Sequence, residues 1–321
     1  QFTGNINQLS QQINSIVMAG AGAQRVFSLI DEKAETDDGF VTLVDADIAP
    51  DGTITESDHH TGHWAWKNPN DNGKVSYREL RGDVRLIDVD FGYVPEKIVL
   101  HDVTLYAEPG QKVAFVGATG AGKSSILNLI GRYYDVQKGS IRVDGVDVRD
   151  LTRDQLRAAI GQVQQDVFIF TGDIKSNIRL RDEEITDEQV HRAAEYTNAS
   201  RFIERLPNGY DEHVTERGAT FSAGQRQLLS FARTLAHDPK ILILDEATAN
   251  IDTETEQWIQ EALERLMQGR TSIMVAHRLS TIQHADRIIV MHHGRIRESG
   301  THQELLKQDG IYKKLYELQL A

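Results

Sequence analysis

The segment Gly117–Ser124 constrains what this chain can fold into more than any other stretch. Its sequence, Gly-Ala-Thr-Gly-Ala-Gly-Lys-Ser, fits the pattern of a glycine, four residues, Gly-Lys, and a serine or threonine. Residues 111–116 before it predict a short buried strand, and residues 125–130 after it predict an amphipathic helix. In that context glycines let backbone N–H groups close around phosphate oxygens, and the helix N-terminus adds a favourable dipole. The segment therefore predicts a phosphate-binding loop.

Two side chains of this loop have predicted roles. Lys123 is expected to reach the β and γ phosphates of a nucleotide, and the Ser124 hydroxyl is expected to ligate Mg²⁺. The full set of expected nucleotide contacts here is Gly117, Ala118, Thr119, Gly120, Ala121, Gly122, Lys123, Ser124 and Ser125.

Composition and charge exclude several classes of protein. A formal charge of −13 provides no basic face, so we expect no nucleic-acid partner. With no cysteine the chain has no disulfide and no thiolate metal site, which suits a reducing compartment. No run of 18 apolar residues occurs, so we expect no segment that spans a bilayer. Because the chain begins at Gln1 and opens in the middle of a pattern, we expect a fragment or processed product of a longer protein.

Residues 2–30 predict one long helix with a single apolar stripe. Apolar or small residues recur at intervals of three and four, at Phe2, Ile6, Leu9, Ile13, Ile16, Gly20, Ala23, Phe27 and Ile30. Such a helix must pack against a partner. The pattern alone leaves two interpretations: a core helix of the domain, or the cytoplasmic end of a membrane helix whose span has been cut off.

The segment from Asp31 to Asp58 is strongly acidic. It holds ten acidic residues and one lysine, a composition that predicts a linker or an exposed insertion. Three histidines follow closely, His59, His60 and His63, and could bind a metal. No further ligand spacing supports a metal, so a solvated loop, or a flap anchored by Trp64 and Trp66, is the favoured interpretation.

A new domain is expected to begin at residue 83. Short apolar strands at residues 84–105 precede the phosphate-binding loop, a mostly helical polar segment covers about residues 149–237, and strands then alternate with helices to residue 291. One or two amphipathic helices are expected at residues 303–320. Alternating strands and helices indicate a mainly parallel sheet covered on both faces.

The strand at residues 241–244 ends in two acids. Ligands lie at the carboxyl ends of strands in an open parallel sheet, so Asp245 and Glu246 are candidates for the phosphate site. Asp245 is expected to hold Mg²⁺ through water, and Glu246 to polarise a water that attacks the γ-phosphate.

A third motif lies between these two, at residues 221–225, Phe-Ser-Ala-Gly-Gln. Ser222 suits the N-cap of the helix at residues 226–235, and the small residues let a helix N-terminus approach an anion closely. Alone, the motif predicts only a capped helix start.

The order of these motifs resembles the ATP-binding cassette (ABC) ATPases. The phosphate-binding loop, the Ser-x-Gly-Gln signature, the Leu-Asp-Glu strand end and the segment Ala276–Thr281 follow one another as in that family, and the resemblance covers about residues 84–320. It implies an α/β fold with a P-loop NTPase (RecA-like) core, an antiparallel β edge subdomain and an α-helical signature subdomain. It also implies an ATPase that uses ATP and Mg²⁺.

The resemblance assigns roles to further residues. Tyr93 would stack on adenine, Gln165 would be the lid glutamine and a Mg²⁺ ligand, and His277 would contact the γ-phosphate. Catalysis would involve Glu246, His277, Gln165 and Lys123, and Mg²⁺ would be held by Ser124, Gln165 and Asp245. In the family each ATP lies between two cassettes, so Ser222, Gly224 and Gln225 would reach the nucleotide of a partner cassette, and Asp252 belongs to the loop after the catalytic strand.

Two features resemble exporters within the family. Thr215–Gly218 resembles the segment that contacts membrane helices, and the helix at residues 2–30 resembles the exit from a last membrane helix. The implied division is residues 1–33 as the end of that helix and a linker, 34–82 as an acidic insertion and 83–321 as the nucleotide-binding domain, at the cytoplasmic face of the cell membrane. The alternatives are a soluble or importer-type ABC ATPase and a non-hydrolysing regulatory clamp. The transported substrate cannot be predicted, because its contacts lie in the membrane helices.

The sequence departs from the family pattern at the signature. Phe221 and Ala223 stand where the family usually has leucine and glycine, and Ala249-Asn250 stands where it usually has Ser-Ala, whereas Glu246 and His277 are intact. This combination resembles one member of a heterodimeric multidrug-type exporter, which we favour as the partner arrangement. The homodimer alternative requires that Ala223 is tolerated at both sites.

Overall fold

The computed structural model describes residues 2–71, 73–164, 167–180, 182–215, 218–245, 253–275 and 282–320, without the side chains of residues 70, 71, 253, 254, 319 and 320. The chain forms two compact units, residues 1–37 and residues 38–321.

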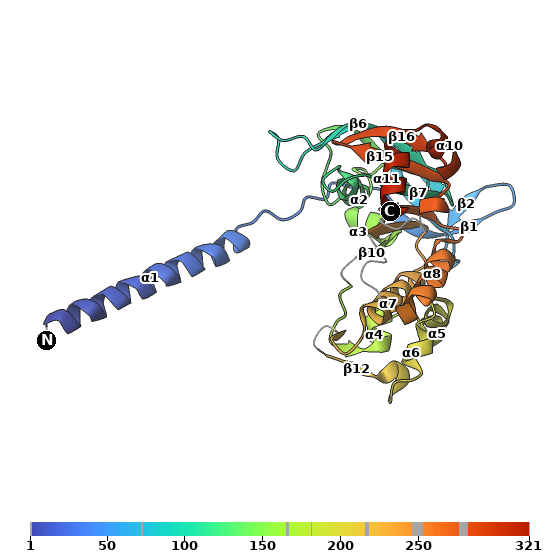
Figure 1. The fold of residues 1–321 in the computed structure, drawn as a ribbon. Coiled ribbons are helices and arrows are strands. Elements are labelled where there is room, and N and C mark those ends of the chain that lie inside the picture. Colours follow the sequence, from blue (N-terminus) through green and yellow to red (C-terminus); the bar gives the residue numbers. More distant parts are fainter. Residues whose placement is uncertain are drawn as a thin grey trace. The chain divides into compact units, whose positions relative to one another are not determined.

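The first unit is one helix, α1, Phe2–Ile30 (Figure 1). None of its residues is buried, and its apolar side chains are exposed. Helix α1 is long and apolar enough to cross a membrane. Signal sequences and the core helices of soluble proteins meet the same criteria of length and composition. The expectation that no segment could span a bilayer was therefore too strict, because it required an uninterrupted apolar run and α1 reaches the criterion despite its Asn and Gln residues.

The second unit is built around a six-stranded sheet. Its strand order is β10 (Ile160–Val163), β13 (Ile241–Asp245), β14 (Thr271–Val275), β7 (Lys112–Val116), β15 (Arg287–His292) and β16 (Arg295–Gly300). All neighbours pair in parallel except β16, which is antiparallel to β15. All of β14 and the first four residues of β13 are buried, as expected for parallel strands covered on both faces.

One face of this sheet packs on helix α2 (Lys123–Ile130) and on an antiparallel sheet. The antiparallel sheet has the order β6 (Leu100–Ala107), β5 (Val84–Phe91), β8 (Lys138–Val143) and β9 (Val146–Asp147). Residues of α2, β5 and the central strands share one hydrophobic cluster, exemplified by Ile126, Leu86 and Ile273. The antiparallel sheet therefore holds α2, and with it the loop that leads into α2, against the central sheet.

The other core cluster unites the central sheet with most of the helices. The elements on this side are α4 (Ile174–Arg179), α5 (Asp187–Tyr196), α6 (Ser200–Ile203), α7 (Ala223–Ala236), α8 (Thr253–Met267), α10 (His302–Lys307) and α11 (Ile311–Leu320). Figure 1 shows α4, α5, α6 and α7 grouped together. The remaining short elements are α3 (Arg153–Ala158), a 3₁₀ turn at Gly209–Asp211, and the paired strands β11 (Gly172–Asp173) and β12 (His213–Val214). The predicted helical segment 149–237 thus also contains β10, a strand of the central sheet that the sequence did not predict.

The acidic segment contains an unexpected four-stranded antiparallel sheet, which we call the inserted sheet. Its order is β2 (Ile54–Glu56), β1 (Thr42–Ile48), β3 (Trp64–Asp71) and β4 (Lys74–Glu79). The linker interpretation is therefore wrong for this part of the segment. The acids of β1 alternate with apolar residues, so they stay accessible while Val41, Ala46 and Trp66 become buried.

One buried carboxylate ties the inserted sheet to the rest of the unit. Asp144 accepts hydrogen bonds from Trp66 Nε1 (3.1 Å) and from the backbone N–H groups of Arg81 (3.2 Å) and Asp83 (2.9 Å). Burial raises the pKa of Asp144, and these donors oppose that shift. The contact joins Trp66 to a residue 78 positions away, which local composition cannot reveal.

Candidate functional site

The predicted phosphate-binding loop connects β7 to α2. Gly117 has φ 146°, and a Cβ there would lie 2.3 Å from the carbonyl oxygen of Met291 on β15. Gly122 has φ 99°, and a Cβ there would lie 2.5 Å from Leu100 Cδ2. Both positions therefore require glycine, for conformation and for space. The Gly294 N–H also donates to the Ala121 carbonyl (3.1 Å), so the turn after β15 supports the loop.

Helix α2 begins without a side-chain cap. Its N-cap residue is Gly122, which has no side chain to accept a hydrogen bond from the N–H groups of the first turn. Those groups carry the positive end of the helix dipole and suit an anion. Six of the eight residues of α2 are buried, so packing stabilises a helix that lacks a cap.

Lys123 lies over the same loop. Its ammonium donates to the carbonyl oxygens of Gly117 (2.7 Å) and Ala118 (3.0 Å), and the residue is only 6% exposed. A fixed ammonium beside uncapped helical N–H groups concentrates positive charge in a protein whose net charge is −13.

Tyr93 lies beside the loop although it is distant in sequence. It follows β5, about half of it is exposed, and its hydroxyl forms a hydrogen bond with Ser125 Oγ (2.9 Å). The structure therefore brings the predicted base-stacking residue to the start of α2, where the phosphate-binding loop ends.

Asp245 ends its strand at the edge of the sheet from which the loop emerges. Asp245 on β13 is paired with Val275 on β14, and Val275 with Phe115 on β7. Because these strands are parallel, their carboxyl ends lie together, which is where ligands bind in such sheets. The carboxylate and the Ser124 hydroxyl supply oxygen donors of the kind that Mg²⁺ takes.

Four predicted site residues, Gln165, Glu246, Asp252 and His277, lie outside the described residues. In the sequence, three of them follow β10, β13 and β14 within two residues. Their roles stay predictions.

The signature segment begins helix α7. Ser222 Oγ accepts from the Gln225 N–H (3.2 Å), and Gln225 Oε1 accepts from the Ser222 N–H (3.0 Å), which makes a reciprocal capping box. Gly224 is buried, Ala223 is exposed, and Phe221 packs edge-on against Phe202 (5.8 Å between ring centroids). Phe221, unusual for the family, is therefore part of the helical core.

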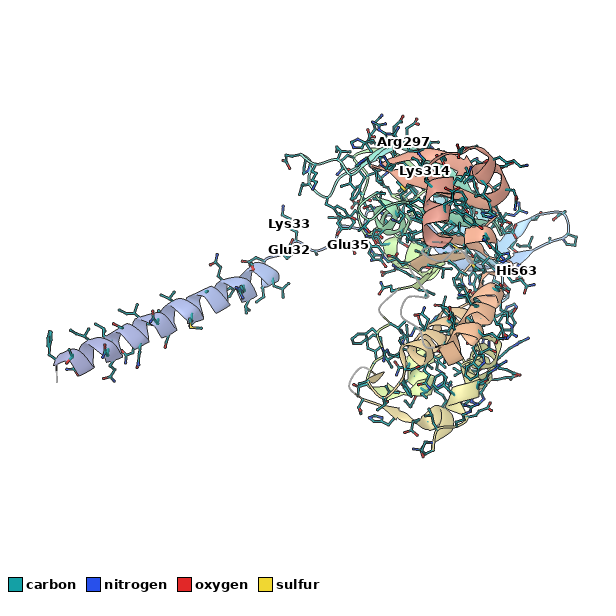
Figure 2. All side chains as sticks on the ribbon, viewed as in Figure 1. Glu32, Lys33, Glu35, His63, Arg297 and Lys314 are labelled. Atoms are coloured by element: carbon teal, nitrogen blue, oxygen red, sulfur yellow. The ribbon has the colours of Figure 1, made fainter. Side chains whose placement is uncertain are left out.

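The three histidines do not assemble a metal site. His59 Nδ1 lies 3.1 Å from Ser57 Oγ, His60 Nδ1 lies 3.2 Å from Asp45 Oδ1, and His63 is exposed (Figure 2). Across the described part of the chain, no group of three or more His, Asp or Glu side chains is placed to hold a metal ion. His59 and His60 lie in the loop before β3, and His63 directly precedes its first residue, Trp64.

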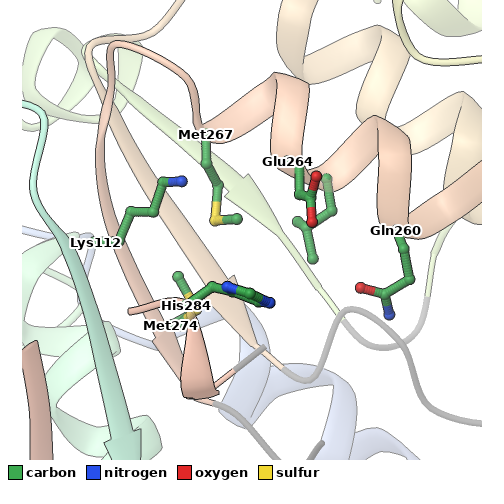
Figure 3. A pocket seen from close by; sticks show the side chains of 7 residues that line it. Lys112, Gln260, Glu264, Met267, Met274 and His284 are labelled. Atoms are coloured by element: carbon green, nitrogen blue, oxygen red, sulfur yellow. The ribbon is translucent and has the colours of Figure 1, made fainter. Parts of the chain in front are cut away.

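Two hollows lie away from the phosphate-binding loop. One, of about 390 Å³, has Leu263, Met267 and Met274 in its lining, with Lys112, Glu264 and His284 around them (Figure 3). The other, of about 620 Å³, lies between the inserted sheet and the end of α7. Neither is lined by a described residue of the predicted nucleotide site.

Sequence reasoning missed an exposed aromatic pair. Phe168 and Phe170 are 45% and 53% exposed, and their rings meet edge to face at 4.8 Å. Arg233 of α7 donates to the Phe168 carbonyl (3.1 Å) and fixes this segment. The only signal in the sequence is two phenylalanines close behind Gln165.

Comparisons with known proteins agree with this geometry. Residues 100–249 match the family described as "ABC transporter". The chain is 44% identical over 319 residues to the uncharacterized ABC transporter ATP-binding protein YfiC of Bacillus subtilis, covering 99% of this chain and 48% of that protein. It is 42% identical over 309 residues to the ATP-dependent lipid A-core flippase of Desulfotalea psychrophila, covering 96% and 48%. The chain thus spans about half the length of the curated relatives it matches.

A solved structure shows the same fold. A bacterial Atm1-family ABC exporter with ATP bound matches with a TM-score of 0.71 and 42% identity, covering 75% of this chain and 42% of that chain. The match confirms the predicted fold class, an α/β cassette with an antiparallel β subdomain and a helical subdomain.

Proposed function

Because this chain belongs to the ABC transporter family, whose members hydrolyse ATP to power transport, we propose that it is the ATP-binding and ATP-hydrolysing part of an exporter. The observation that carries the proposal is the uncapped helix α2, with Lys123 over its loop and Asp245 ending its strand at the same edge of the sheet. Exporter relatives support the direction of transport.

ATP binding uses two parts of the site. Tyr93 stacks on the base, and residues 117–125 enclose the phosphates with backbone N–H groups, while Lys123 exchanges its carbonyl contacts for phosphate oxygens. That exchange is favourable because a charged acceptor makes a stronger hydrogen bond to an ammonium than a neutral carbonyl does.

Mg²⁺ is held by Ser124, Asp245 and Gln165. When bound, the ion neutralises charge on the β and γ phosphates. The chain's own contribution is an alcohol, a carboxylate and an amide, all oxygen donors. Asp245 and Ser124 come from different elements, so strand pairing and the loop together orient them.

Hydrolysis requires a base and a fixed γ-phosphate. Glu246 accepts a proton from the attacking water on its carboxylate, and His277 holds a γ-phosphate oxygen through an imidazole N–H. Gln165 orients the water, and Asp252, six residues after Glu246 in the sequence, completes the predicted set.

A second cassette completes the site. Ser222, Gly224 and Gln225 at the N-terminus of α7 face the γ-phosphate bound by a partner. Ala223 at the first position of α7 adds a methyl group there, which supports a heterodimer in which the site served by this signature turns over slowly. Strong cooperative ATPase activity from a homodimer of the parent protein would contradict the heterodimer.

The membrane domains of the same transporter are the second partner. Helix α1 continues from the last membrane helix, and the exposed Phe168 and Phe170 give those domains an apolar contact. Thr215–Gly218, of which residues 216 and 217 lie outside the described residues, is the second predicted contact. The protein then acts at the cytoplasmic face of the cell membrane. Recovery of the parent protein only from the cytosolic fraction would favour the soluble or importer-type alternative.

The test of the proposed function uses the 321-residue chain and its parent transporter. Calorimetry should show Mg²⁺-dependent ATP binding by the chain, and a phosphate-release assay should show turnover by the parent. Absence of ATP binding overturns the proposal, and ATP binding without phosphate release by the parent assembly favours the regulatory clamp.

A further inference from the structure

The residue expected to stack on the base is held by a turn from another part of the chain. We propose that Tyr134 and Gln137, in the turn that follows α2, are positioning residues that fix Tyr93 for nucleotide binding. The inference rests on the proposed ATP site and adds residues that neither the sequence motifs nor the family comparisons assign.

Tyr134 fixes the ring of Tyr93. The two rings meet edge to face, with centroids 5.0 Å apart and planes at 88°. Buried Phe91 completes the cluster, 5.0 Å from Tyr93 and 5.7 Å from Tyr134. Tyr134, Phe91 and the hydrogen bond to Ser125 therefore set the orientation of the Tyr93 side chain. Tyr93 is still 48% exposed, so its ring is accessible to a base.

Gln137 fixes the backbone beside Tyr93. Its Oε1 accepts from the Gly92 N–H (2.9 Å), and its Nε2 donates to the Gly92 carbonyl (2.7 Å). The Gln137 N–H also donates to the Asp90 carbonyl (3.2 Å). One side chain thus satisfies both polar groups of the residue that precedes Tyr93, as a neighbouring strand would.

The turn that carries these residues is itself rigid. Arg132 takes a left-handed conformation (φ 50°) just after α2, and its buried guanidinium donates to the Leu151 carbonyl (2.8 Å) and to Asp135 Oδ1 (3.1 Å). A non-glycine residue in this conformation is unfavourable by itself, so the surrounding contacts hold it. A fixed turn at the far end of α2 is what a positioning role requires, because α2 begins at the phosphates.

The physical consequence is preorganisation. A stacking side chain that already has its bound orientation loses little conformational freedom when the base arrives. Edge-to-face aromatic pairs contribute enough to change affinity about threefold to tenfold. Loss of Tyr134 or Gln137 should weaken the binding of the base and not that of the phosphates, because both residues contact the segment that stacks on the base.

The experiment compares ATP with inorganic tripolyphosphate, which lacks a base, by calorimetry on the 321-residue chain with Mg²⁺. Tyr134→Ala and Gln137→Ala should each weaken ATP binding about threefold to tenfold and leave tripolyphosphate binding unchanged. Tyr134→Phe keeps the ring and should restore ATP affinity. Tyr133→Ala is the matched control, since Tyr133 is equally exposed but contacts Arg157 and Gln162 instead.

A double-mutant cycle tests whether Tyr134 affects ATP affinity through Tyr93. In a Tyr93→Ala background, Tyr134→Ala should have no further effect on ATP affinity. An equal loss for ATP and tripolyphosphate, an effect of Tyr133→Ala as large as that of Tyr134→Ala, or unchanged ATP affinity in both alanine variants would each overturn the positioning role. If the unaltered chain binds neither ligand, the proposed ATP site itself fails, which is a different outcome.

Discussion

Helices α2 and α7 both present an N-terminus to a predicted phosphate, yet they begin in opposite ways. α2 starts at an uncapped, left-handed Gly122, whereas α7 starts with the reciprocal cap of Ser222 and Gln225. The capped start is common in this chain, because α5 and α10 also begin with capping boxes, at Thr186 and Thr301. Helices α3 and α6 share the uncapped start of α2, but α2 is the uncapped helix that follows the predicted phosphate-binding loop.

The difference separates two ways to use a helix N-terminus. Gly122 has no side chain to cap the first turn of α2, so backbone N–H groups at this helix start suit an incoming phosphate. At α7 the Ser222 hydroxyl already accepts from the Gln225 N–H, and its own O–H proton can donate to an anion while that bond is kept. This difference leads to the prediction that α2 binds nucleotide in a single chain and that α7 contributes when a second cassette closes over it.

The largest expected effect tests whether Glu246, which follows β13, is the base for ATP hydrolysis. Glu246→Gln should lower phosphate release by the parent transporter about 100- to 10,000-fold, because an amide cannot accept the proton of water. ATP affinity should stay within about twofold, since the substitution preserves shape. Phosphate release and calorimetry measure the two quantities. The exposed Glu264→Gln on α8 is the control, and unchanged turnover in Glu246→Gln would remove Glu246 as the base.

The next-largest effect tests whether the phosphate-binding loop and α2 bind ATP without a partner cassette. Lys123→Ala should weaken ATP binding by the chain about 10- to 100-fold, because it removes a charged hydrogen-bond donor. The substitution also removes two bonds to loop carbonyls, so thermal unfolding without nucleotide must accompany the calorimetry. Lys112→Ala at the start of β7 is the control. An affinity equal to that of the unaltered chain would show that the uncapped helix alone provides the site.

The structural elements that follow a short local pattern could be predicted from the sequence. The loop, strand β13 with its terminal acid and the signature segment each depend on spacing within one segment, and the parallel sheet follows from alternating strands and helices. The capping box of Ser222 follows from its glutamine three residues on.

The remaining parts depend on contacts between distant segments. The inserted sheet is stabilised where Trp66 meets Asp144, and the acids on its exposed face hide the apolar alternation that would have predicted strands. β10 is only four residues long, with Gly161 and Gln162 in the middle, so it becomes a strand by pairing with β13. The support of Tyr93 by Gln137 likewise joins segments 45 residues apart, counted from Gly92.

A smaller effect separates the cap of α7 from its predicted role at the phosphate. Ser222→Ala should lower the free energy of unfolding by about 1 kcal/mol, because the Gln225 N–H loses its acceptor. Thr186→Ala removes an equivalent cap from α5, so it should cause a similar loss. Urea unfolding measures both variants, and phosphate release by the parent distinguishes them. Turnover should fall only in Ser222→Ala; a similar fall in Thr186→Ala would attribute the effect to stability.

The smallest effect concerns the other end of α7, where His237 is the C-cap residue. Burial lowers the pKa of His237 and nearby Arg233 lowers it further, while the Asp182 carboxylate, 3.7 Å from Nδ1, opposes the shift. As the pH falls, His237 in the unfolded chain therefore takes up a proton near pH 6.5, whereas His237 in the folded chain takes it up at a lower pH. His237 contributes stability above that pH, and the contribution is lost as the pH falls toward its lower folded pKa. Between pH 7.5 and 5.5, the urea midpoint should fall less in His237→Gln than in the unaltered chain, whereas exposed His63→Gln should leave the fall unchanged. Equal falls in all three chains would show that His237 does not account for the loss of stability in acid.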